Sequence, residues 1–427
     1  MSTSTPLAAT ALTVAMWLAP VPARAQGEVG QTLTLEEALE IATANSPVLM
    51  AATARVEEAS GGLTQAAVLL LENPAITVSR GRRSALSGST SFEPEFEVGL
   101  EQQLEIGGQR GKRMGMATAE VEVARAEATD TRRIVELAVA QSFFEGLAAA
   151  ERTRLADENE QVASRLLDLA RRRLSAGAGT PLEVNAATIR LAAARRLRLG
   201  AITEPQVAFL TLRSHLGVDL ADDTALRGEL PSTAPAAVEA AVLSRALLRR
   251  PDLLAEGGRV EAAGASDRLA GAEGWPDVSL TASLAQEEGT QLLSAGVRIP
   301  LALFNRNQGG RAAATAAYER ANAEREAKSL EVAADARAAV TLYEQARSAA
   351  ELYDTQVLAA MEESAALMQL AVESGELGVA DVLVVQAELL SGQVGYVDAR
   401  LDLATAGARI RAAVGAFQSV ALEEVVR

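Results

Sequence analysis

The sequence predicts a mainly α-helical protein with a small β part, built from two copies of one unit. Three pairs of glycines, each pair separated by 198 residues, mark corresponding points of the copies: Gly111 and Gly309, Gly177 and Gly375, Gly217 and Gly415. In each copy the second of these glycines lies 66 positions after the first with no proline between them, and two short alternating segments precede the first. An internal repeat of this size constrains the architecture before any local motif does.

The N-terminus has the pattern of a secretory signal. An apolar stretch runs from Leu7 to Pro20, and Ala23-Arg24-Ala25 fits the small-x-small rule for cleavage. We therefore expect a signal peptide over residues 1–25 and a mature start near Gln26, although no Lys or Arg precedes the apolar stretch. Beyond this region no uninterrupted apolar stretch reaches about 18 residues, so the sequence does not predict a helical membrane protein.

Composition excludes several classes of function. The formal net charge of −16 argues against a nucleic-acid partner, since phosphate binding requires a basic surface. With no cysteine and one histidine, the chain offers no disulfide, thiolate zinc site or multi-histidine metal site. The scattered carboxylates form no set of nucleophile, base and orienting group. We predict neither an enzyme nor a cofactor, and no resident metal.

The first copy is predicted to span residues 26–220. Thr34-Leu35-Glu36-Glu37 reads as a capping box that begins a helix, and Pro47 separates this helix from a second one. Alternating residues then predict two strands within about 74–104. A long helix follows at about 111–175, and a return helix at about 182–217.

The second copy repeats this order. Residues 221–234 form a linker, and the second copy spans 235–427, with Pro251 again dividing two helices. The expected strands lie at about 276–301, the long helix at about 309–374 and the return helix at about 379–417.

The long helices are predicted to form coiled coils. A helix of 66 residues would be about 100 Å long, far beyond ordinary globular helices. Apolar residues of the second copy step by three and four on both legs of the hairpin, as in a coiled-coil seam: Leu358, Met361, Ala365, Met368 and Val372, then Leu383, Ala387, Leu390, Val394, Val397 and Leu401.

The strands have the alternation of a sheet with one apolar face. Phe96, Val98 and Leu100 can face lipid while Glu95, Glu97 and Glu101 face water. Four strands cannot close a membrane barrel, and unpaired edges are costly in lipid. Three chains would together supply 12 strands. A soluble amphipathic hairpin packed on helices is the alternative.

The order of these features resembles the TolC-like outer-membrane efflux proteins. The resemblance covers nearly all of the mature chain. It rests on the order of features, which begins with Leu35-Glu36-Glu37-Ala38-Leu39 and Ser46-Pro47 and continues with a strand pair and a long helix. A glycine turn follows, leading into Glu183-Val184 in the first copy and Asp381-Val382-Leu383 in the second, and the whole order is duplicated. The segments 105–113 and 305–309, with sequences EIGGQRGKR and NRNQG, further resemble the branch that serves heavy-metal pumps of the RND type.

This resemblance implies a homotrimer with a 12-stranded β-barrel in the outer membrane, continued by a 12-helix α-barrel through the periplasm. Its function would be a passive exit duct for heavy-metal cations. Its partners would be outer-membrane lipid, a periplasmic adaptor and an inner-membrane RND transporter. Multidrug export or type I secretion within the same family is an alternative. A secreted coiled-coil scaffold without a barrel is an alternative from another class.

The resemblance also assigns candidate site residues. The two turns after the long helices would form the periplasmic tip and contact the adaptor, through Gly177, Gly179 and Glu183 in the first copy and Gly375, Glu376 and Gly378 in the second. Asp381 occupies the position of a gate aspartate, whose three copies would form a cation-selecting ring. The family's second gate aspartate corresponds to Val384. Alternatively, Asp381 and, more so, Glu183 are helix N-terminal charges.

Overall fold

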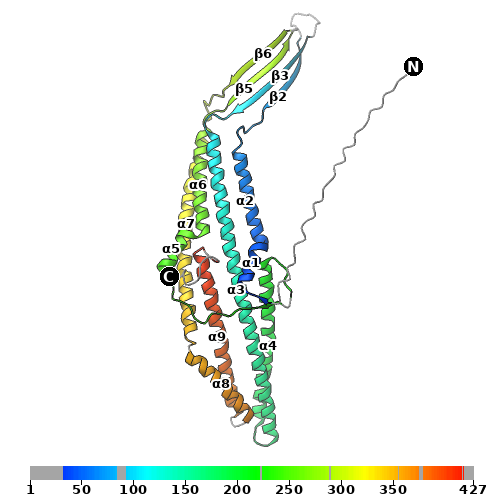
Figure 1. Cartoon of the computed structure of the whole chain (residues 1–427), viewed down its shortest axis with the longest axis vertical. Helices are drawn as coiled ribbons and strands as arrows, with labels where there is room; N and C mark the ends of the chain where they lie inside the picture. The colour runs from blue at the N-terminus through cyan, green and yellow to red at the C-terminus, as the bar shows by residue number, and fades with distance from the viewer. Residues whose placement is uncertain are drawn as a thin grey trace, which may run out of the picture.

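In the computed structural model the chain is elongated, with a sheet at one end and helix turns at the other (Figure 1). The structure describes residues 32–83, 93–221, 224–287, 290–353, 355–374, 378–415 and 417. The predicted signal peptide, 1–25, lies outside the described residues.

The first copy contains six elements that follow the predicted order: α1 (Leu35–Asn45), α2 (Pro47–Ala66), β2 (Ala75–Arg83), β3 (Glu93–Leu104), α3 (Gln109–Ser175) and α4 (Pro181–Leu216). The predicted capping box is present. The Glu37 backbone N–H donates to Thr34 Oγ1 over 3.3 Å, and the Thr34 N–H donates to Glu37 Oε2 over 2.8 Å. Two of the free donors at the start of α1 are thereby satisfied.

The second copy follows the same order with one difference. Its elements are α5 (Glu239–Arg249), α6 (Pro251–Ala272), β5 (Val278–Glu287), β6 (Thr290–Arg298), α7 (Gln308–Glu351), α8 (Thr355–Ser374) and α9 (Val379–Ala413). The difference is that two helices, α7 and α8, stand where one long helix was predicted. The return helix, α9, ends at Ala413, four residues before the predicted end at 417.

The prediction of one continuous helix over 309–374 is wrong. α7 ends at Glu351 and α8 begins at Thr355. Between them the ring of Tyr353 packs on Tyr396 of α9, with 5.3 Å between ring centroids, and its hydroxyl lies against Gly395. Residues 351–355 contain no proline or glycine, so the local sequence gives no sign of the break. The break coincides instead with the contact between Tyr353 and α9.

The four long strands form one antiparallel sheet in the order β2-β3-β5-β6. The pairing of β3 with β5 joins the two copies. β2 and β6 are the outer strands, and among the described residues their outer edges have no partner strand.

The register of this sheet gives it one apolar and one polar face. Val78, Val98, Leu284 and Leu293 lie side by side across the four strands, and the next row on the opposite face is Thr77, Gly99, Ser283 and Ser294. The apolar row is exposed in the single chain: Leu293 is 79% exposed and Val78 is 62% exposed. The predicted division between Phe96, Val98 and Leu100 on one face and the glutamates on the other follows from the same register.

A second, small sheet joins the N-terminal segment to the linker. β1 (Thr32–Leu33) pairs in parallel with β4 (Ala225–Leu226). Leu33 is fully buried and packs in a cluster with Phe143, Leu212 and Leu216. The sequence did not predict this pairing, because two-residue strands carry no periodicity.

α4 remains helical through Pro205. Proline has no N–H, so the carbonyl oxygen of Ala201, four residues earlier, loses its usual helical donor. The hydroxyl of Thr153 on α3 donates to this oxygen over 2.7 Å. A side chain from the neighbouring helix thus satisfies the acceptor that the proline leaves free.

Each copy contains a close approach between its last helix and its helix-proline-helix junction. Gly217 has φ +71°, and a Cβ there would lie 2.6 Å from the carbonyl oxygen of Asn45 and 2.7 Å from Pro47. Gly415, with φ +77°, approaches the carbonyl oxygen of Arg249 in the same way, with 2.8 Å between that oxygen and a Cβ. Both glycines are required by backbone conformation and by space.

Arg250, next to Pro251, carries a buried charge. Its Nη2 lies 2.6 Å from Asp252 Oδ2, and its Nη1 lies 3.1 Å from Asp335 Oδ2. Burial alone raises the pKa of the Asp252 carboxyl, but the hydrogen bonds and charge of Arg250 outweigh it and hold that pKa below its usual range. Asp252 is therefore the ionised partner of a buried cation.

We predict that Gly217→Ala and Gly415→Ala each destabilise the fold by about 2–4 kcal/mol, because alanine is strained at positive φ and has no room for its methyl group. Thermal unfolding followed by circular dichroism measures this. Gly200→Ala is the control, since Gly200 lies within α4 with nothing within 4 Å of a Cβ. Equal unfolding temperatures for all three variants would contradict the assignment.

We also predict that Asp252→Asn destabilises the protein by about 3 kcal/mol at pH 7, because it removes the main partner of a buried charge. The lowered folded-state pKa means that ionised Asp252 stabilises the fold above about pH 4 and loses this contribution as the pH falls through the folded pKa. The difference between wild type and variant should therefore shrink in acid. The Asp335 carboxylate is 52% exposed, so Asp335→Asn should destabilise the protein by less than about 1 kcal/mol.

Candidate functional site

Both helical hairpins reverse at the end of the molecule opposite the sheet (Figure 1). At the first reversal Gly177 has φ +69°. Its N–H donates to Leu174 O over 3.0 Å, and the Ala178 N–H donates to Arg173 O over 2.9 Å. This pair of hydrogen bonds is a Schellman motif, which uses glycine to end a helix and satisfy its last carbonyl groups.

Gly179 and Glu183 complete the first turn. A Cβ on Gly179 would lie 2.9 Å from Arg173 Cβ, so the chain passes too close to the end of α3 for a side chain. The Glu183 N–H donates to Thr180 Oγ1 over 3.3 Å, and Glu183 Oε2 lies 4.0 Å from Arg173 Nε. Glu183 thus lies in the first turn of α4, where its charge favours the helix dipole, and faces a cation on the other leg.

In the second turn the structure describes Gly378 and Asp381, whereas Gly375 and Glu376 lie outside the described residues. Gly378 precedes α9 in an extended conformation. Asp381 is exposed in the first turn of α9, and its Oδ2 would lie 3.1 Å from a Cβ on Gly378. This position suits a helix N-terminal charge, and it also leaves the carboxylate open to solvent.

The structure brings the second hairpin against the first near these turns. Val382, directly after Asp381, is 1% exposed and packs with Leu166 of α3. Leu383 packs against the cluster that includes Ala187 of α4. Asp381 and Val384 are both exposed, and Val384 is 70% exposed. The apolar neighbours therefore fix the helix while the gate candidate and Val384 stay in solvent.

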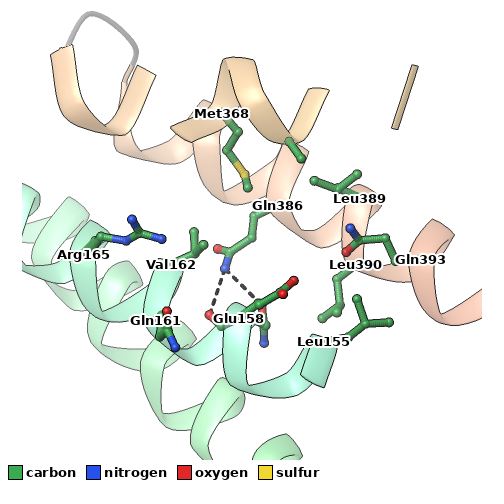
Figure 2. A pocket seen from close by; sticks show the side chains of 12 residues that line it. Leu155, Glu158, Gln161, Val162, Arg165, Met368, Gln386, Leu389, Leu390 and Gln393 are labelled. Carbon is green, nitrogen blue, oxygen red and sulfur yellow. Dashed lines mark hydrogen bonds between the residues drawn. The ribbon is translucent and has the colours of Figure 1, made fainter. Parts of the chain in front are cut away.

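A cavity of about 370 Å³ lies between α3 and the second hairpin, farther from the turns (Figure 2). Gln386 crosses it, and its Nε2 donates to Asn159 Oδ1 over 3.0 Å and to Asn159 O over 3.3 Å. Both side chains are buried, and Gln386 Oε1 has no hydrogen-bond partner among the described residues. An amide pair thus connects the two hairpins, with Gln386 using only part of its bonding capacity.

Sequence reasoning did not identify this pair. The available signal was a polar residue between apolar ones, because Gln386 lies three residues after Leu383 and three before Leu389. An ion pair farther up the same contact, Arg152 Nη2 to Asp398 Oδ1 at 2.6 Å, also connects α3 to α9. Polar contacts at two levels therefore hold the second hairpin on the first.

Within the described part of the chain, no group of three or more His, Cys, Asp or Glu side chains is placed to hold a metal ion. Likewise, none of its helices combines the length and the apolarity needed to cross a membrane.

Two curated relatives share much of the chain. Over 372 residues it is 27% identical to the cobalt-zinc-cadmium resistance protein CzcC of Cupriavidus metallidurans, which covers 86% of this chain and 87% of that protein. Over 307 residues it is 28% identical to the pyoverdine export outer membrane protein OpmQ of Pseudomonas putida, covering 65% of this chain and 63% of that protein.

Solved structures share the fold. The outer membrane protein VceC of Vibrio cholerae matches with a TM-score of 0.70 and 21% identity over 90% of this chain and 97% of that one. CusC, whose structures concern folding and transmembrane channel formation, matches with a TM-score of 0.70 and 20% identity, over 90% and 92% of the two chains. The model of the outer membrane efflux protein family matches residues 38–218 and 242–416, one segment in each copy, and the chain belongs to that family.

Proposed function

We propose that three copies of this chain form the outer-membrane exit duct of a tripartite efflux system that exports heavy-metal cations. An inner-membrane RND pump and a periplasmic adaptor would supply the substrate, and the duct would conduct it passively. Support for the metal substrate comes from the relative named for cobalt, zinc and cadmium resistance, which is similar over most of both chains.

The observation that carries the duct is the sheet with two open edges and one apolar face. The outer edges of β2 and β6 have no partner strand among the described residues. In lipid, unpaired backbone groups cost several kcal/mol each, so the strands require neighbours. Pairing β6 of one protomer with β2 of the next would satisfy them, and three protomers would close a barrel of 12 strands.

The polar face of the sheet would then line the channel. Thr77, Ser283 and Ser294 lie on it, and Ser283 and Ser294 are hydrogen-bonded to each other over 2.8 Å. The apolar face, with Leu284 and Leu293, would contact outer-membrane lipid. The α3–α4 and α7–α9 hairpins would continue the duct into the periplasm.

The turns at the far end of the hairpins are the proposed adaptor contact, comprising Gly177, Gly179, Glu183, Gly375, Glu376 and Gly378. Exposed apolar side chains beside the described part of these turns support the proposal, since an exposed apolar patch typically marks a contact surface. Leu182 is 76% exposed and Leu370 is 61% exposed.

Asp381 is the proposed gate residue. Its exposed carboxylate at the start of α9 is free to face the axis of a trimer, where three copies would attract cations and repel anions. Val384, one turn later, offers a second exposed but uncharged position. The gate would therefore contain one ring of carboxylates, from Asp381, and no second ring at Val384.

Export of small organic molecules is the second candidate substrate class, favoured by the match to a pyoverdine export protein. Membership of the efflux family leaves no reason to prefer a secreted scaffold without a barrel.

To test the function, we would delete the gene in its native host and measure cellular cobalt, zinc and cadmium by mass spectrometry. We expect metal to accumulate, and wild type and Ser283→Gln, a larger but uncharged change on the channel face, to restore export. Leu284→Lys should fail, because a lysine on the lipid face costs about 2–4 kcal/mol near the middle of the bilayer. Heat-modifiable trimers on gels report assembly. Unchanged metal content with accumulation of siderophores or dyes would instead indicate organic export.

For the gate, we expect Asp381→Asn to lower the preference of reconstituted channels for cations over anions, because the ring loses its charge. Single-channel recording in planar bilayers under a salt gradient measures the reversal potential. Asp168→Asn removes an exposed carboxylate from α3 on the other hairpin and should leave the potential unchanged. Identical potentials for Asp381→Asn and wild type would show that the gate assignment is wrong.

A further inference from the structure

The cavity between α3 and the second hairpin lies between two apolar contacts that bring these helices together. On the side of the turns, Leu166 of α3 packs with Val382 of α9. On the other side, Leu155 of α3 and Val397 of α9 share an apolar cluster. The space of about 370 Å³ is thus bounded by helices that are held together at both of its ends. It is largely preformed, as ligand-binding cavities usually are.

Gln386 offers this cavity a hydrogen-bond acceptor. The residue is 3% exposed, and its Nε2 donates to Asn159 Oδ1 over 3.0 Å and to Asn159 O over 3.3 Å. Because a backbone carbonyl can only accept, the nitrogen of the Gln386 amide must face Asn159. The oxygen points away from these bonds and has no hydrogen-bond partner among the described residues (Figure 2). A buried carbonyl without a donor is unfavourable, so this oxygen favours a ligand that supplies an N–H or O–H group.

Most of the remaining buried lining is apolar. Leu155 and Leu389 are almost fully buried, and Val162 and Met368 add further apolar surface. Water fills such a space poorly, because each molecule requires about two to four polar partners. A cavity of about 150 Å³ is enough to hold benzene, so this larger one has room for a ring with a short substituent.

The charged residues of the lining lie where the cavity meets solvent. Glu158 and Arg165 are both exposed. Their charges are opposite, and Glu158 Oε1 already accepts from Arg154 Nη1 over 2.5 Å. The opening therefore selects neither an anion nor a cation. Together with the neutral amide in the interior, this arrangement favours an uncharged ligand.

We propose that the cavity binds a small uncharged molecule with an apolar body and one O–H or N–H group, such as an aromatic alcohol, which donates its hydrogen bond to Gln386 Oε1. The apolar body contacts Leu155 of α3, Met368 of α8 and Leu389 of α9. A bound molecule thus touches both hairpins. The site lies within a single chain and depends neither on the substrate of the duct nor on trimer formation.

Thiol labelling of the full-length, detergent-extracted protein tests the proposal, since the chain has no cysteine. Ala365→Cys places one thiol in the cavity wall, and Ala366→Cys, at an exposed neighbour outside the wall, is the matched control. The probes are benzyl alcohol and toluene, which share a ring and differ in the hydroxyl group. We expect benzyl alcohol to slow the reaction of Ala365→Cys with methyl methanethiosulfonate about tenfold at ten times its Kd, because mass action then leaves about a tenth of the cavities empty. Toluene at the same concentration should protect much less.

Gln386→Leu in the Ala365→Cys background should remove the protection by benzyl alcohol, because the acceptor is lost. The comparison of the two probes needs no change at Gln386, so it tests the proposal even where this variant does not fold. Equal protection by toluene would overturn the role of Gln386 in selecting the ligand. No protection by either probe, or equal slowing of Ala366→Cys, would show that the cavity holds only water.

Discussion

The outer edges of β2 and β6, which no described strand of the chain covers, are the constraint on which the rest of the molecule depends. Each copy of the repeat contributes one hairpin, and the β3–β5 pairing joins the hairpins into a sheet whose two outer edges have no partner strand in the described part of the chain. In an aqueous setting such edges would invite aggregation, and in lipid they would be prohibitive. The sheet is stable in a membrane only when other chains pair with it, so duplication alone does not complete the structure.

The helical hairpins show how duplication was followed by divergence. The α3–α4 hairpin has a continuous long helix and a turn closed by Gly177, whereas the second hairpin is interrupted between α7 and α8 beside Tyr353. The contacts between the hairpins are polar at Gln386 and Arg152 and apolar at Val382. The second hairpin thus differs from the first both in its continuity and in the polar groups that hold it to its neighbour.

The middle of the molecule is held by backbone contacts that both copies repeat. Gly217 and Gly415 each bring the end of a return helix onto the carbonyl oxygen before a helix-proline-helix junction. Buried charge accompanies these contacts, with Arg250 paired to Asp252. Arg411 lines a cavity in the same region, between α9, the start of α1 and the linker. These contacts hold each copy together independently of the sheet.

The sequence by itself determined the order of elements, the duplication, the two faces of the sheet and the family, because periodicity, prolines and glycines act locally and recur at fixed spacing. It also predicted the two chain reversals near which Gly177, Gly179, Glu183, Gly378 and Asp381 lie, while their roles in adaptor contact and gating stay predictions. Only the tertiary structure decided the break at Tyr353, the β1–β4 pairing, the donation from Thr153 to the carbonyl oxygen of Ala201 and the Gln386–Asn159 pair. Each of these depends on which side chain of a distant helix lies opposite, and no local pattern encodes that.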